Sequence, residues 1–588
     1  MNKKNEPLKM TYMRALENYK KRDYKNAATY CYKILSIDSY HLDSILMLAS
    51  IAGSNKDYDQ AKELLVKAIE IQPKNTTAIH NLGTCYKELK KFDEAKKYYE
   101  KVLEIDSKHT NANYNLGIIY YELKDLNKAK SYFKKTTEIQ KNYGIAFFSL
   151  GNVYADLKEY NEAMSSYQKA IEINPRIVGA HNNLGLIYRT LNDLENAVKS
   201  YQNAIKLQPK HSGAYHNLAL AYKELGKFSK SIESHERAIE YEPENLAHYY
   251  YLSELKKEML NSNLKNKIEK SLSSKKLTKK DNAFGNYLLA KYERKEKNYQ
   301  KELKFLIEGH KYFFDSMKKK FELGIKYCFD DVLQIQEKVK VEKANTDKYD
   351  EVNPIFIVGV PRCGSTLVEK IIASGSKTIP MGEETGIIEN FVNKKILEKQ
   401  ALNLGVCAEI RKELNRLYKD RGLLSEKYNN TFTDKSLNNF FYFKLIKQIY
   451  PKAKIINCKR DKLSSIMSIF QNNLTELAWA HSLNNILKYF DNYFEIMDNY
   501  DQEMPNTMYH LEFEKLTTEP EKESKKLMTF CELPWDKKCL EFYKRKDLIS
   551  KTASNIQIRE AIYIRSLDKY SNYKKLLQKY GKKYPWFN

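Results

Sequence analysis

The chain has 588 residues, enough for several domains, and its 100 Lys and Arg residues outnumber 75 Asp and Glu residues for a net charge of +25. The positive residues are mostly Lys, spread evenly and without an RNA-binding signature, so we expect no nucleic-acid partner. Eight scattered cysteines without a C-x-x-C pair argue against a zinc or disulfide framework, and no run of about 18 apolar residues predicts a transmembrane segment.

The first residues, MNKKNEPLKMTYMRALENYKKRDYK, run directly into a charged helical pattern. They lack the apolar core of a signal peptide. We therefore expect a cytoplasmic protein.

A short string recurs through the first half of the chain as HNLGTCY, YNLGIIY, FSLGNVY, HNNLGLIY and HNLALAY. Its small residue returns every 34 residues, and alanine and proline columns follow the same period. This predicts seven helix pairs between about residues 8 and 245, with small residues where helices cross closely and proline where a pair ends. The small residues are Gly83, Gly117, Gly151, Gly185 and Ala219.

These columns resemble the tetratricopeptide repeat, which implies an all-α superhelix with a concave binding surface. In the repeat domain of O-linked N-acetylglucosamine transferase, asparagines two positions before the small residue hold a peptide backbone, since an amide both donates and accepts. The resemblance implies an acceptor groove for a protein or peptide, although asparagine is also simply common at this position. The asparagines concerned are Asn81, Asn115, Asn183 and Asn217.

Between residues 250 and 350 the repeat register is lost, whereas helical periodicity continues. Residues 284–313 predict one more repeat-like hairpin, and residues 261–281 predict a mobile connector. We therefore expect residues 258–350 to be a helical capping and linker region.

From residue 354, apolar strand-like runs alternate with helical patterns, which is typical of an α/β domain with a parallel sheet. The stretch IFIVGVPRCGSTLVEKII predicts a strand over 354–360, a tight turn and a helix from residue 366. Four residues separate Gly359 from Gly364, as in the phosphate loops of ATPases and kinases. Backbone N–H groups at a helix N-terminus predict an anion site here.

The loop lacks the lysine of a triphosphate-binding enzyme, because Ser365 follows the second glycine. A second strand over 453–461 ends at Arg460, where a magnesium site would need a carboxylate. Ser468 follows eight residues later, so that arginine and serine can grip one phosphate. The sequence predicts two anion sites and no metal site, which fits a nucleotide with phosphate at both ends of its ribose.

Residues 354–588 resemble a sulfotransferase that uses 3′-phosphoadenylyl sulfate (PAPS). GVPRCGSTL resembles the loop for the 5′-phosphosulfate, and RDKLSSIMS resembles the 3′-phosphate motif. MGEETGIIEN and FTDKSLNNF resemble segments of the tyrosylprotein sulfotransferases. The resemblance implies PAPS as co-substrate, adenosine 3′,5′-bisphosphate (PAP) as product, and no metal.

By position, the resemblance implies that Arg362 and Lys435 stabilise charge on the sulfuryl group and its leaving oxygen. Glu384 is implied as the general base, with Glu383 as its adjacent rival, and we expect His481 and His510 to pack or to face solvent. The implied cofactor-binding residues are Pro361, Arg362, Cys363, Gly364, Ser365, Thr366, Arg460 and Ser468, with Ser554 and Arg559 in a late loop.

The chain departs from the family pattern in this late loop, where Glu560–Ala561 replaces a polar–proline pair, and in the phosphate loop. There Cys363 stands for the usual serine and Ser365 for the usual threonine. Because Cys363 and Ser365 are similar in size to the residues they replace, the prediction of a phosphate loop stands. The late-loop assignments depend on a poorer match to the family.

The sequence thus predicts an all-α tetratricopeptide-repeat superhelix (8–257), the capping and linker region (258–350), and an α/β P-loop-like sulfotransferase domain with a central parallel sheet (352–588). The implied function is transfer of a sulfuryl group from PAPS to an acceptor hydroxyl, with protein tyrosine among the candidates. Alternatives are a carbohydrate or lipid acceptor, and a repeat scaffold with an inert PAP-binding domain.

Overall fold

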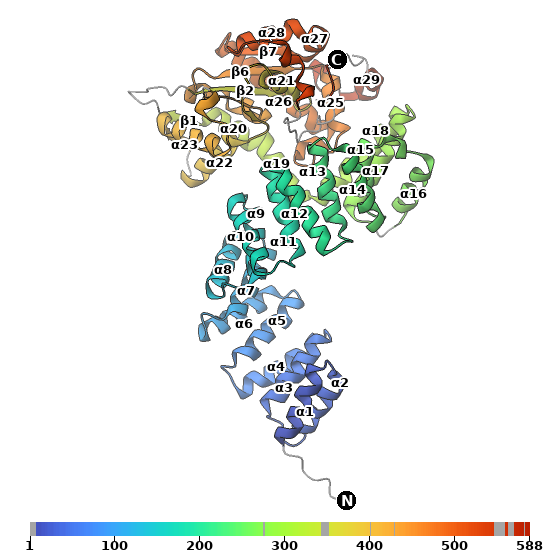
Figure 1. Ribbon diagram of the computed structural model, residues 1–588, viewed down its shortest axis with the longest axis vertical. Helices are drawn as coiled ribbons and strands as arrows, with labels where there is room; N and C mark the ends of the chain where they lie inside the picture. The colour runs from blue at the N-terminus through green and yellow to red at the C-terminus, as the bar shows by residue number, and fades with distance from the viewer. Residues whose placement is uncertain are drawn as a thin grey trace, which may run out of the picture. The chain divides into compact units, whose positions relative to one another are not determined.

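The computed structural model describes residues 8–274, 277–342, 352–399, 402–428, 430–545, 559–562, 570–580 and 583–587. The chain divides into two compact units, with the seam between Leu218 and Ala219. This seam falls inside one helix, α13 (Ser212–Glu224). Figure 1 labels the elements of both units.

The first unit consists of consecutive helix pairs, each joined by a short turn (Figure 1). The pairs follow the 34-residue period, and they confirm the predicted all-α repeat superhelix. The helices are α1 (Leu8–Lys20), α2 (Tyr24–Leu35), α3 (Leu42–Ser54), α4 (Tyr58–Ile71), α5 (Thr76–Glu88), α6 (Phe92–Ile105), α7 (Thr110–Glu122), α8 (Leu126–Ile139), α9 (Gly144–Asp156), α10 (Tyr160–Ile173), α11 (Val178–Thr190), α12 (Leu194–Leu207) and α13.

The small-residue column lets an aromatic ring cross close to the first helix of each pair. A Cβ added at Gly83 would lie 3.0 Å from the Tyr99 ring, and one at Gly151 would lie 2.6 Å from the Tyr167 ring. Both rings are buried. Because packed interiors leave no room for such an overlap, these positions require glycine, whereas the repeat with Ala219 accommodates a Cβ there. The equivalent pairs are Gly117 with Phe133 and Gly185 with Tyr201.

Each helix pair turns through one residue with positive φ, two residues before the second helix begins. Most of these residues are lysine, although the left-handed region costs a residue with a Cβ about 1 kcal/mol. Only the last position uses glycine, so no turn signature marks this column in the sequence. The residues are Arg22, Lys56, Lys90, Lys124, Lys158, Asn192 and Gly226, with φ between 60° (Lys90) and 73° (Gly226).

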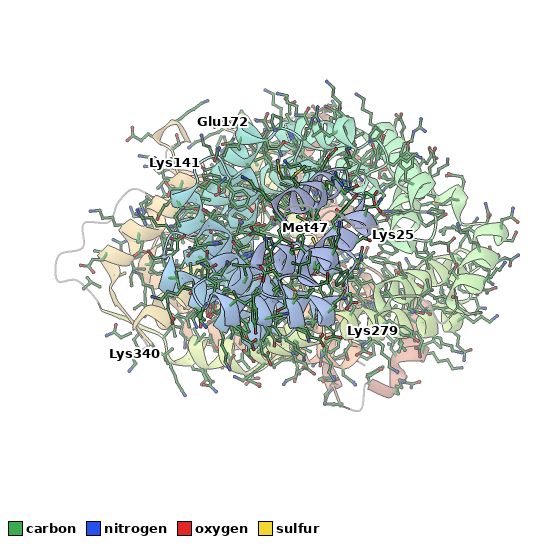
Figure 2. The ribbon with its side chains drawn as sticks, turned by 90° about the horizontal axis from the view of Figure 1, so that it is seen from below. Lys25, Met47, Lys141, Glu172, Lys279 and Lys340 are labelled. Carbon is green, nitrogen blue, oxygen red and sulfur yellow. The ribbon has the colours of Figure 1, made fainter. Side chains whose placement is uncertain are left out.

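Lysine side chains carry the positive charge at the surface of both units. Lys25 and Lys141 in the first unit, and Lys279 and Lys340 in the second, are exposed, whereas Met47 is buried (Figure 2). The charge is therefore solvated and distributed rather than confined to one element.

The second unit begins with helices that continue from the repeats. The hairpin predicted over 284–313 is confirmed by α17 (Lys279–Lys295) and α18 (Tyr299–Ser316). The predicted mobile connector is wrong over Ser262–Leu272, which forms α16 because Asn261 caps its first turn at 3.0 Å and Ile268 is buried. The other helices are α14 (Phe228–Tyr241), α15 (Leu246–Leu255), α19 (Lys318–Lys326) and α20 (Val332–Lys338).

The rest of the second unit is built around a five-stranded parallel sheet in the order β3-β5-β2-β6-β7. The predicted strand over 354–360 is observed as β2 (Asn353–Gly359), and that over 453–461 as β6 (Lys454–Lys459). This confirms the predicted α/β domain with a central parallel sheet. The remaining strands are β3 (Met381–Gly382), β5 (Thr431–Asp434) and β7 (Met508–Glu512), while β1 (Lys340–Glu342) pairs separately with β4 (Asn403–Val406).

Helices follow the strands and cover the sheet (Figure 1). Of these, α21 (Ser365–Ala373) and α25 (Lys462–Phe470) begin shortly after β2 and β6, beside the predicted anion-binding residues. The others are α22 (Ile387–Lys399), α23 (Cys407–Asp420), α24 (Phe443–Ile449), α26 (Leu483–Glu503), α27 (Phe513–Thr518), α28 (Pro520–Phe530) and α29 (Ser571–Leu577).

The helices before the sheet share one core with it. His310 on α18 lies 3.0 Å from His481 through their Nδ1 atoms, and its Nε2 contacts the carbonyl oxygen of Phe470 at 2.7 Å. Gln471 donates to the buried carboxylate of Glu302 at 3.0 Å. The helical segment and the α/β domain are thus one folded body.

Candidate active site

The phosphate loop connects β2 to α21 through two residues in the left-handed region. Arg362 has φ of 71° and Gly364 has φ of 98°, and Gly364 directly precedes the first residue of α21. A Cβ at Gly364 would collide with the Phe513 ring, so only glycine allows this approach. Ser365 and Thr366 begin the helix and are buried. The loop therefore presents the N-terminus of a nine-residue helix at the C-terminal end of β2, the middle strand of the sheet.

The two predicted anion motifs converge on Arg362. Its Nε donates to the hydroxyl of Ser468 on α25 at 3.0 Å. Its carbonyl oxygen accepts a hydrogen bond from Nη1 of Arg460 at 2.8 Å, and the Arg460 guanidinium lies 4.9 Å from the Phe513 ring centroid. The structure thus brings together Arg362, Arg460 and Ser468, from segments about 100 residues apart.

Pro361 and Cys363 complete the loop. Cys363 is buried, and its backbone N–H donates to the carbonyl oxygen of Val360 at 3.2 Å. A hydrogen bond from Cys458 of β6 lowers the pKa of the Cys363 thiol. Cys363 thus packs between loop and sheet.

Lys435 lies directly after β5 and faces two carboxylates. Its Nζ lies 3.3 Å from Oε1 of Glu384 and 4.0 Å from Oε1 of Glu383. Burial alone would lower the pKa of Lys435, but the charges of Glu384, Glu383 and Glu369 outweigh burial and raise it. The lysine side chain is 0% exposed, Glu383 14% and Glu384 58%. A permanently charged, buried lysine therefore lies beside an accessible carboxylate.

A buried carboxylate that the sequence analysis did not identify connects the two loops of this pair. Asp434, the last residue of β5, accepts hydrogen bonds from Thr385 (2.9 Å) and Tyr418 (2.7 Å) through Oδ2. Its Oδ1 accepts from the hydroxyl of Ser436 at 2.7 Å. Since Thr385 follows Glu384 and Ser436 follows Lys435, Asp434 positions both. The only local signal was its place beside Lys435.

Glu369 on α21 is a second carboxylate that sequence analysis missed. It is buried, and the hydroxyl of Thr433 donates to its Oε1 at 2.7 Å. Burial raises the pKa of Glu369 to about 7, although the nearby charge of Lys435 opposes the shift. It completes a carboxylate-rich surrounding for Lys435.

Two residues of the late loop were predicted to bind the cofactor. Of these, Ser554 lies outside the described residues. Arg559 lies against the turn between α13 and α14, where its Nη2 donates to the carbonyl oxygen of Glu224 at 2.9 Å. Its guanidinium lies 6.0 Å from the centroid of the Phe228 ring. The structure therefore gives Arg559 a contact with the helical segment.

The two histidines that we expected to pack or to face solvent both contact other side chains. His481 is buried and stacks on Phe321, with ring centroids 4.9 Å apart. His510 lies 2.9 Å from Asp501 through Nε2. Both contacts agree with structural roles.

The predicted asparagine column forms hydrogen bonds along the first unit. Asn183 donates to Asn152 at 2.9 Å, and Asn217 donates to Asn182 at 3.0 Å. Asn115 lies 3.0 Å from Nε2 of His80, whose Nδ1 lies 3.2 Å from Oδ1 of Asn81. Because an amide carries two N–H donors and one acceptor oxygen, a single bond does not exhaust these side chains.

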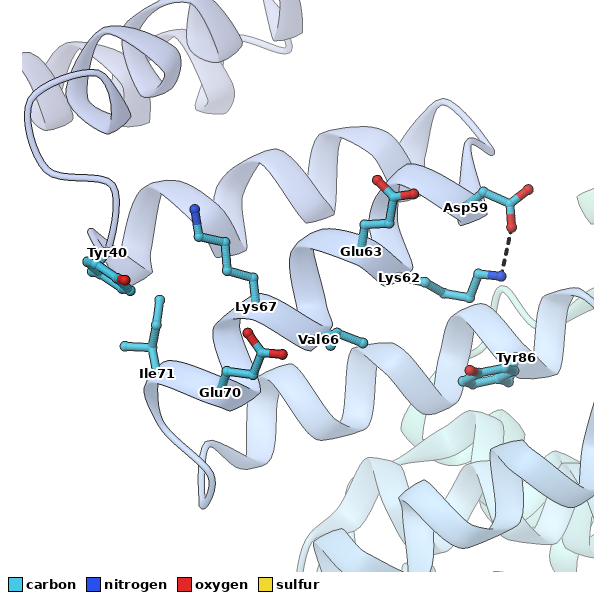
Figure 3. Close-up of a pocket in the computed structure, with 9 residues that line it drawn as sticks. All are labelled: Tyr40, Asp59, Lys62, Glu63, Val66, Lys67, Glu70, Ile71 and Tyr86. Atoms are coloured by element: carbon cyan, nitrogen blue, oxygen red, sulfur yellow. Dashed lines mark ion pairs between the residues drawn. The ribbon is translucent and has the colours of Figure 1, made fainter.

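An open pocket of about 1020 Å³ lies on the first unit along α4 (Figure 3). It mixes both charges, and Lys62 pairs with Asp59 at 2.7 Å. No member of the asparagine column lines it, and it lacks the convergent cations of the phosphate loop. Its lining residues are Tyr40, Asp59, Lys62, Glu63, Val66, Lys67, Glu70, Ile71 and Tyr86.

The described part of the chain has neither a cluster of metal ligands nor a membrane-spanning helix. No group of three or more His, Cys, Asp or Glu side chains there is arranged to hold a metal ion. Within the same residues, no helix combines the length and apolar character needed to cross a bilayer.

Comparison with known families agrees with this geometry. Residues 354–537 match the model of the sulfotransferase family. Models of the tetratricopeptide repeat match residues 41–108, 75–142, 151–190, 185–226 and 212–245.

Two curated relatives match parts of the chain. A protein of Aquifex aeolicus (strain VF5) is 29% identical over 323 residues, which cover 53% of this chain and 42% of the relative. Protein-tyrosine sulfotransferase A of Caenorhabditis elegans is 26% identical over 229 residues, covering 35% of this chain and 57% of that protein. The chain thus spans about half the length of the curated relatives it matches.

Solved structures match smaller parts. MamA is 26% identical, with 28% of this chain and 95% of that chain covered and a TM-score of 0.27. YrrB, described as a TPR protein with an unusual peptide-binding site, is 26% identical over 32% of this chain and 98% of that chain (TM-score 0.29). The pilF protein of Pseudomonas aeruginosa is 18% identical over 36% and 97% (TM-score 0.34).

The segment that the family model matches contains the phosphate loop, Arg460 with Ser468, and Lys435 with Glu384. Residues 354–537 therefore form a sulfotransferase-family domain, and tetratricopeptide repeats precede it in the same chain.

Proposed function

We propose that the protein is a sulfotransferase that moves a sulfuryl group from PAPS to a hydroxyl of an acceptor. The observation that carries the proposal is the convergence of Arg362 with Ser468 at 3.0 Å and with Arg460 at 2.8 Å. Two separate motifs, each expected to hold one phosphate, thereby meet at the C-terminal ends of the neighbouring strands β2 and β6. A nucleotide with phosphate at both ends of its ribose would bring one anionic group to each motif.

The polar groups of the loop fit such a ligand. The Nε of Arg460 is buried and has no hydrogen-bond partner, although buried donors are normally satisfied. The hydroxyls of Ser365 and Thr366 lie at the N-terminus of α21, where backbone N–H groups and the helix dipole favour an anion. Arg362, Gly364, Ser365 and Thr366 would hold the 5′-phosphosulfate, and Arg460 and Ser468 the 3′-phosphate.

The reaction that we propose needs one base and two fixed positive charges. PAPS supplies the sulfuryl group, which passes to the acceptor oxygen while its bond to the phosphate breaks and leaves PAP. Glu384 accepts the proton of the acceptor hydroxyl, because its exposed carboxylate can be reached from solvent. Lys435 and Arg362 stabilise the negative charge that develops on the transferred group and on the departing oxygen. Lys435 suits this role because the carboxylates around it keep it protonated.

For the acceptor we propose a protein or peptide, held along the asparagine column of the repeats. The amides of Asn115, Asn183 and Asn217 lie on the first helices of their pairs, with Ser149 in the same column between the first two. A protein tyrosine is the finer proposal, supported by the name of the relative in Caenorhabditis elegans. Carbohydrate and lipid hydroxyls are the competing acceptors.

Ligand binding to the purified protein tests the nucleotide assignment. We expect PAP to raise the melting temperature strongly and ATP to raise it little, because Ser365 replaces the lysine that a triphosphate requires. Equal stabilisation by both nucleotides would contradict the proposal. PAP binding without any turnover of PAPS would instead support the inert scaffold.

Labelled PAPS and fractionated cell extract would test the acceptor. Label that a protease releases supports a protein acceptor, whereas label that a glycosidase releases, or that extracts into organic solvent, contradicts it.

A further inference from the structure

Three helices that precede the sulfotransferase domain bring two lysines to one carboxylate. Glu254 of α15 accepts from Nζ of Lys223 at 2.6 Å through Oε2 and lies 3.9 Å from Nζ of Lys291 through Oε1. Lys223 belongs to α13 and Lys291 to α17. The three side chains are between 14% and 23% exposed, so they form a partly buried cluster within the second unit.

The charge of Arg362 in the phosphate loop acts on the same carboxylate. Burial alone would raise the pKa of Glu254, but the charges of Lys223, Lys291 and Arg362 outweigh it and lower the pKa. Arg362 in turn donates to Ser468 at 3.0 Å.

A second contact links the same regions. The hydroxyl of Tyr250 on α15 accepts the backbone N–H of Asn473 at 3.4 Å, shortly after α25 ends, and Lys291 lies 3.8 Å from the Tyr250 ring centroid. Both side-chain amide atoms of Asn473 are buried without a hydrogen-bond partner. The segment that follows α25, the helix that carries Ser468, therefore contacts the tyrosine beside Lys291.

The charges of the cluster do not balance. Lys223 and Lys291 place two positive charges beside the single carboxylate of Glu254. Burial lowers the pKa of Lys291 to about 8 even with Glu254 beside it. Arg294, the next cation on α17, is paired separately with Glu302 at 2.6 Å. A surplus of positive charge in a partly buried place is stabilised when an anion binds.

We propose that Lys223 and Lys291 complete the nucleotide site from the helical segment, adding positive charge for the 3′-phosphate, with Glu254 as their counter-ion in the free protein. The inference rests on the proposed function, because it takes PAP and PAPS as the ligands. A 3′-phosphate, with up to two negative charges, would be stabilised by the positive charge that one carboxylate leaves unpaired. The helices between Ala219 and Lys338 then belong to the catalytic machinery and not only to the acceptor-binding array.

The test compares PAP with adenosine 5′-monophosphate, which lacks the 3′-phosphate, by titration calorimetry on the full chain. We expect Lys223→Gln and Lys291→Met each to weaken PAP binding about 10-fold, the size of one charge-assisted hydrogen bond, and to change monophosphate binding less than about 2-fold. Glu254→Gln should strengthen PAP binding, because it removes the competing negative charge. Lys291 is the more buried lysine, so Lys223→Gln keeps the test valid if Lys291→Met unfolds.

Lys256→Gln is the matched control, because Lys256 pairs with Glu236 at 2.7 Å in the same segment but outside the cluster. It should leave both affinities unchanged. Lysine variants that keep the wild-type preference for PAP over adenosine 5′-monophosphate would overturn the inference, whether or not their KM for the acceptor rises. If the wild-type protein itself shows no preference for PAP, the proposed nucleotide fails instead, so the two failures are distinguishable.

Discussion

Nζ of Lys435 lies 3.3 Å from the carboxylate of Glu384, and the two side chains differ sharply in exposure, at 0% and 58%. In the proposed reaction the lysine stays charged and needs no contact with solvent, whereas the base takes a proton from the acceptor, and the accessible side chain is that of Glu384. Glu383, 4.0 Å from the same nitrogen, is the less exposed of the two glutamates. This asymmetry favours Glu384 as the base.

The first prediction separates the two glutamates. Glu384→Gln should lower kcat by about 100-fold or more, the size of a lost general base, and leave the affinity for PAP unchanged. Glu383→Gln, the matched control one residue away, should retain most of the activity. Sulfuryl transfer from labelled PAPS measures both variants, and a larger loss in Glu383→Gln would reverse the assignment.

The second prediction concerns the strand-end arginine. Arg460→Met removes the hydrogen bond to the carbonyl oxygen of Arg362 and the proposed 3′-phosphate contact, so PAP affinity should fall at least about 10-fold. Lys459→Met changes the charge at the adjacent exposed position and should have little effect. Calorimetric titration with PAP gives both values. Similar affinities for the two variants would show that net charge, and not the position of Arg460, is responsible.

The third prediction concerns the packing of the repeats. Gly151→Ala would place a Cβ 2.6 Å from the buried Tyr167 ring and should lower the free energy of unfolding by about 1–3 kcal/mol. Gly53→Ala is the control, since no atom lies within 4 Å of its added Cβ. This control should instead stabilise α3 by up to about 1 kcal/mol through helix propensity. Urea unfolding followed by circular dichroism distinguishes the two, and equal effects would reject the packing argument.

The fourth prediction is a pH dependence that originates at Glu369. Its pKa is raised to about 7 in the folded protein from an ordinary value of 4.5, so the folded state keeps a proton that the unfolded state releases between these values. The stability that this protonated group contributes is complete below pH 4.5 and is lost as the pH rises through 7. Glu369→Gln cannot titrate and keeps an acceptor for Thr433, so its stability should fall less than that of the wild type over this range. Parallel pH profiles of the melting temperature would contradict the shift.

Much of the architecture could be predicted because it follows local rules. The 34-residue period indicated the helix pairs, and Gly83 and Gly151 indicated where the two helices of a pair cross closely. The left-handed turn residues stayed hidden because Lys56 and Lys90 carry no turn signature. Helix α16 was missed because the cap at Asn261 and the burial of Ile268 outweigh a composition typical of a connector.

The site divides in the same way. Arg362, Arg460 and Ser468 were predicted from short motifs, and the structure brings them together. Asp434 was not predicted as a positioning residue, because its role depends on Thr385, 49 residues earlier in the chain. Glu254 was not identified because its partners Lys223 and Lys291 lie on two other helices, and no local pattern encodes that arrangement.

The seam between the two units falls inside α13, a helix of the repeat grid, and not at the first strand of the sheet. The unit that contains the sheet therefore includes the end of α13 and the helices after it. In repeat arrays each repeat contacts mainly its neighbours, so such arrays vary in length by whole units. The length of the proposed acceptor groove can then change by whole helix pairs while the residues of the proposed active site stay the same.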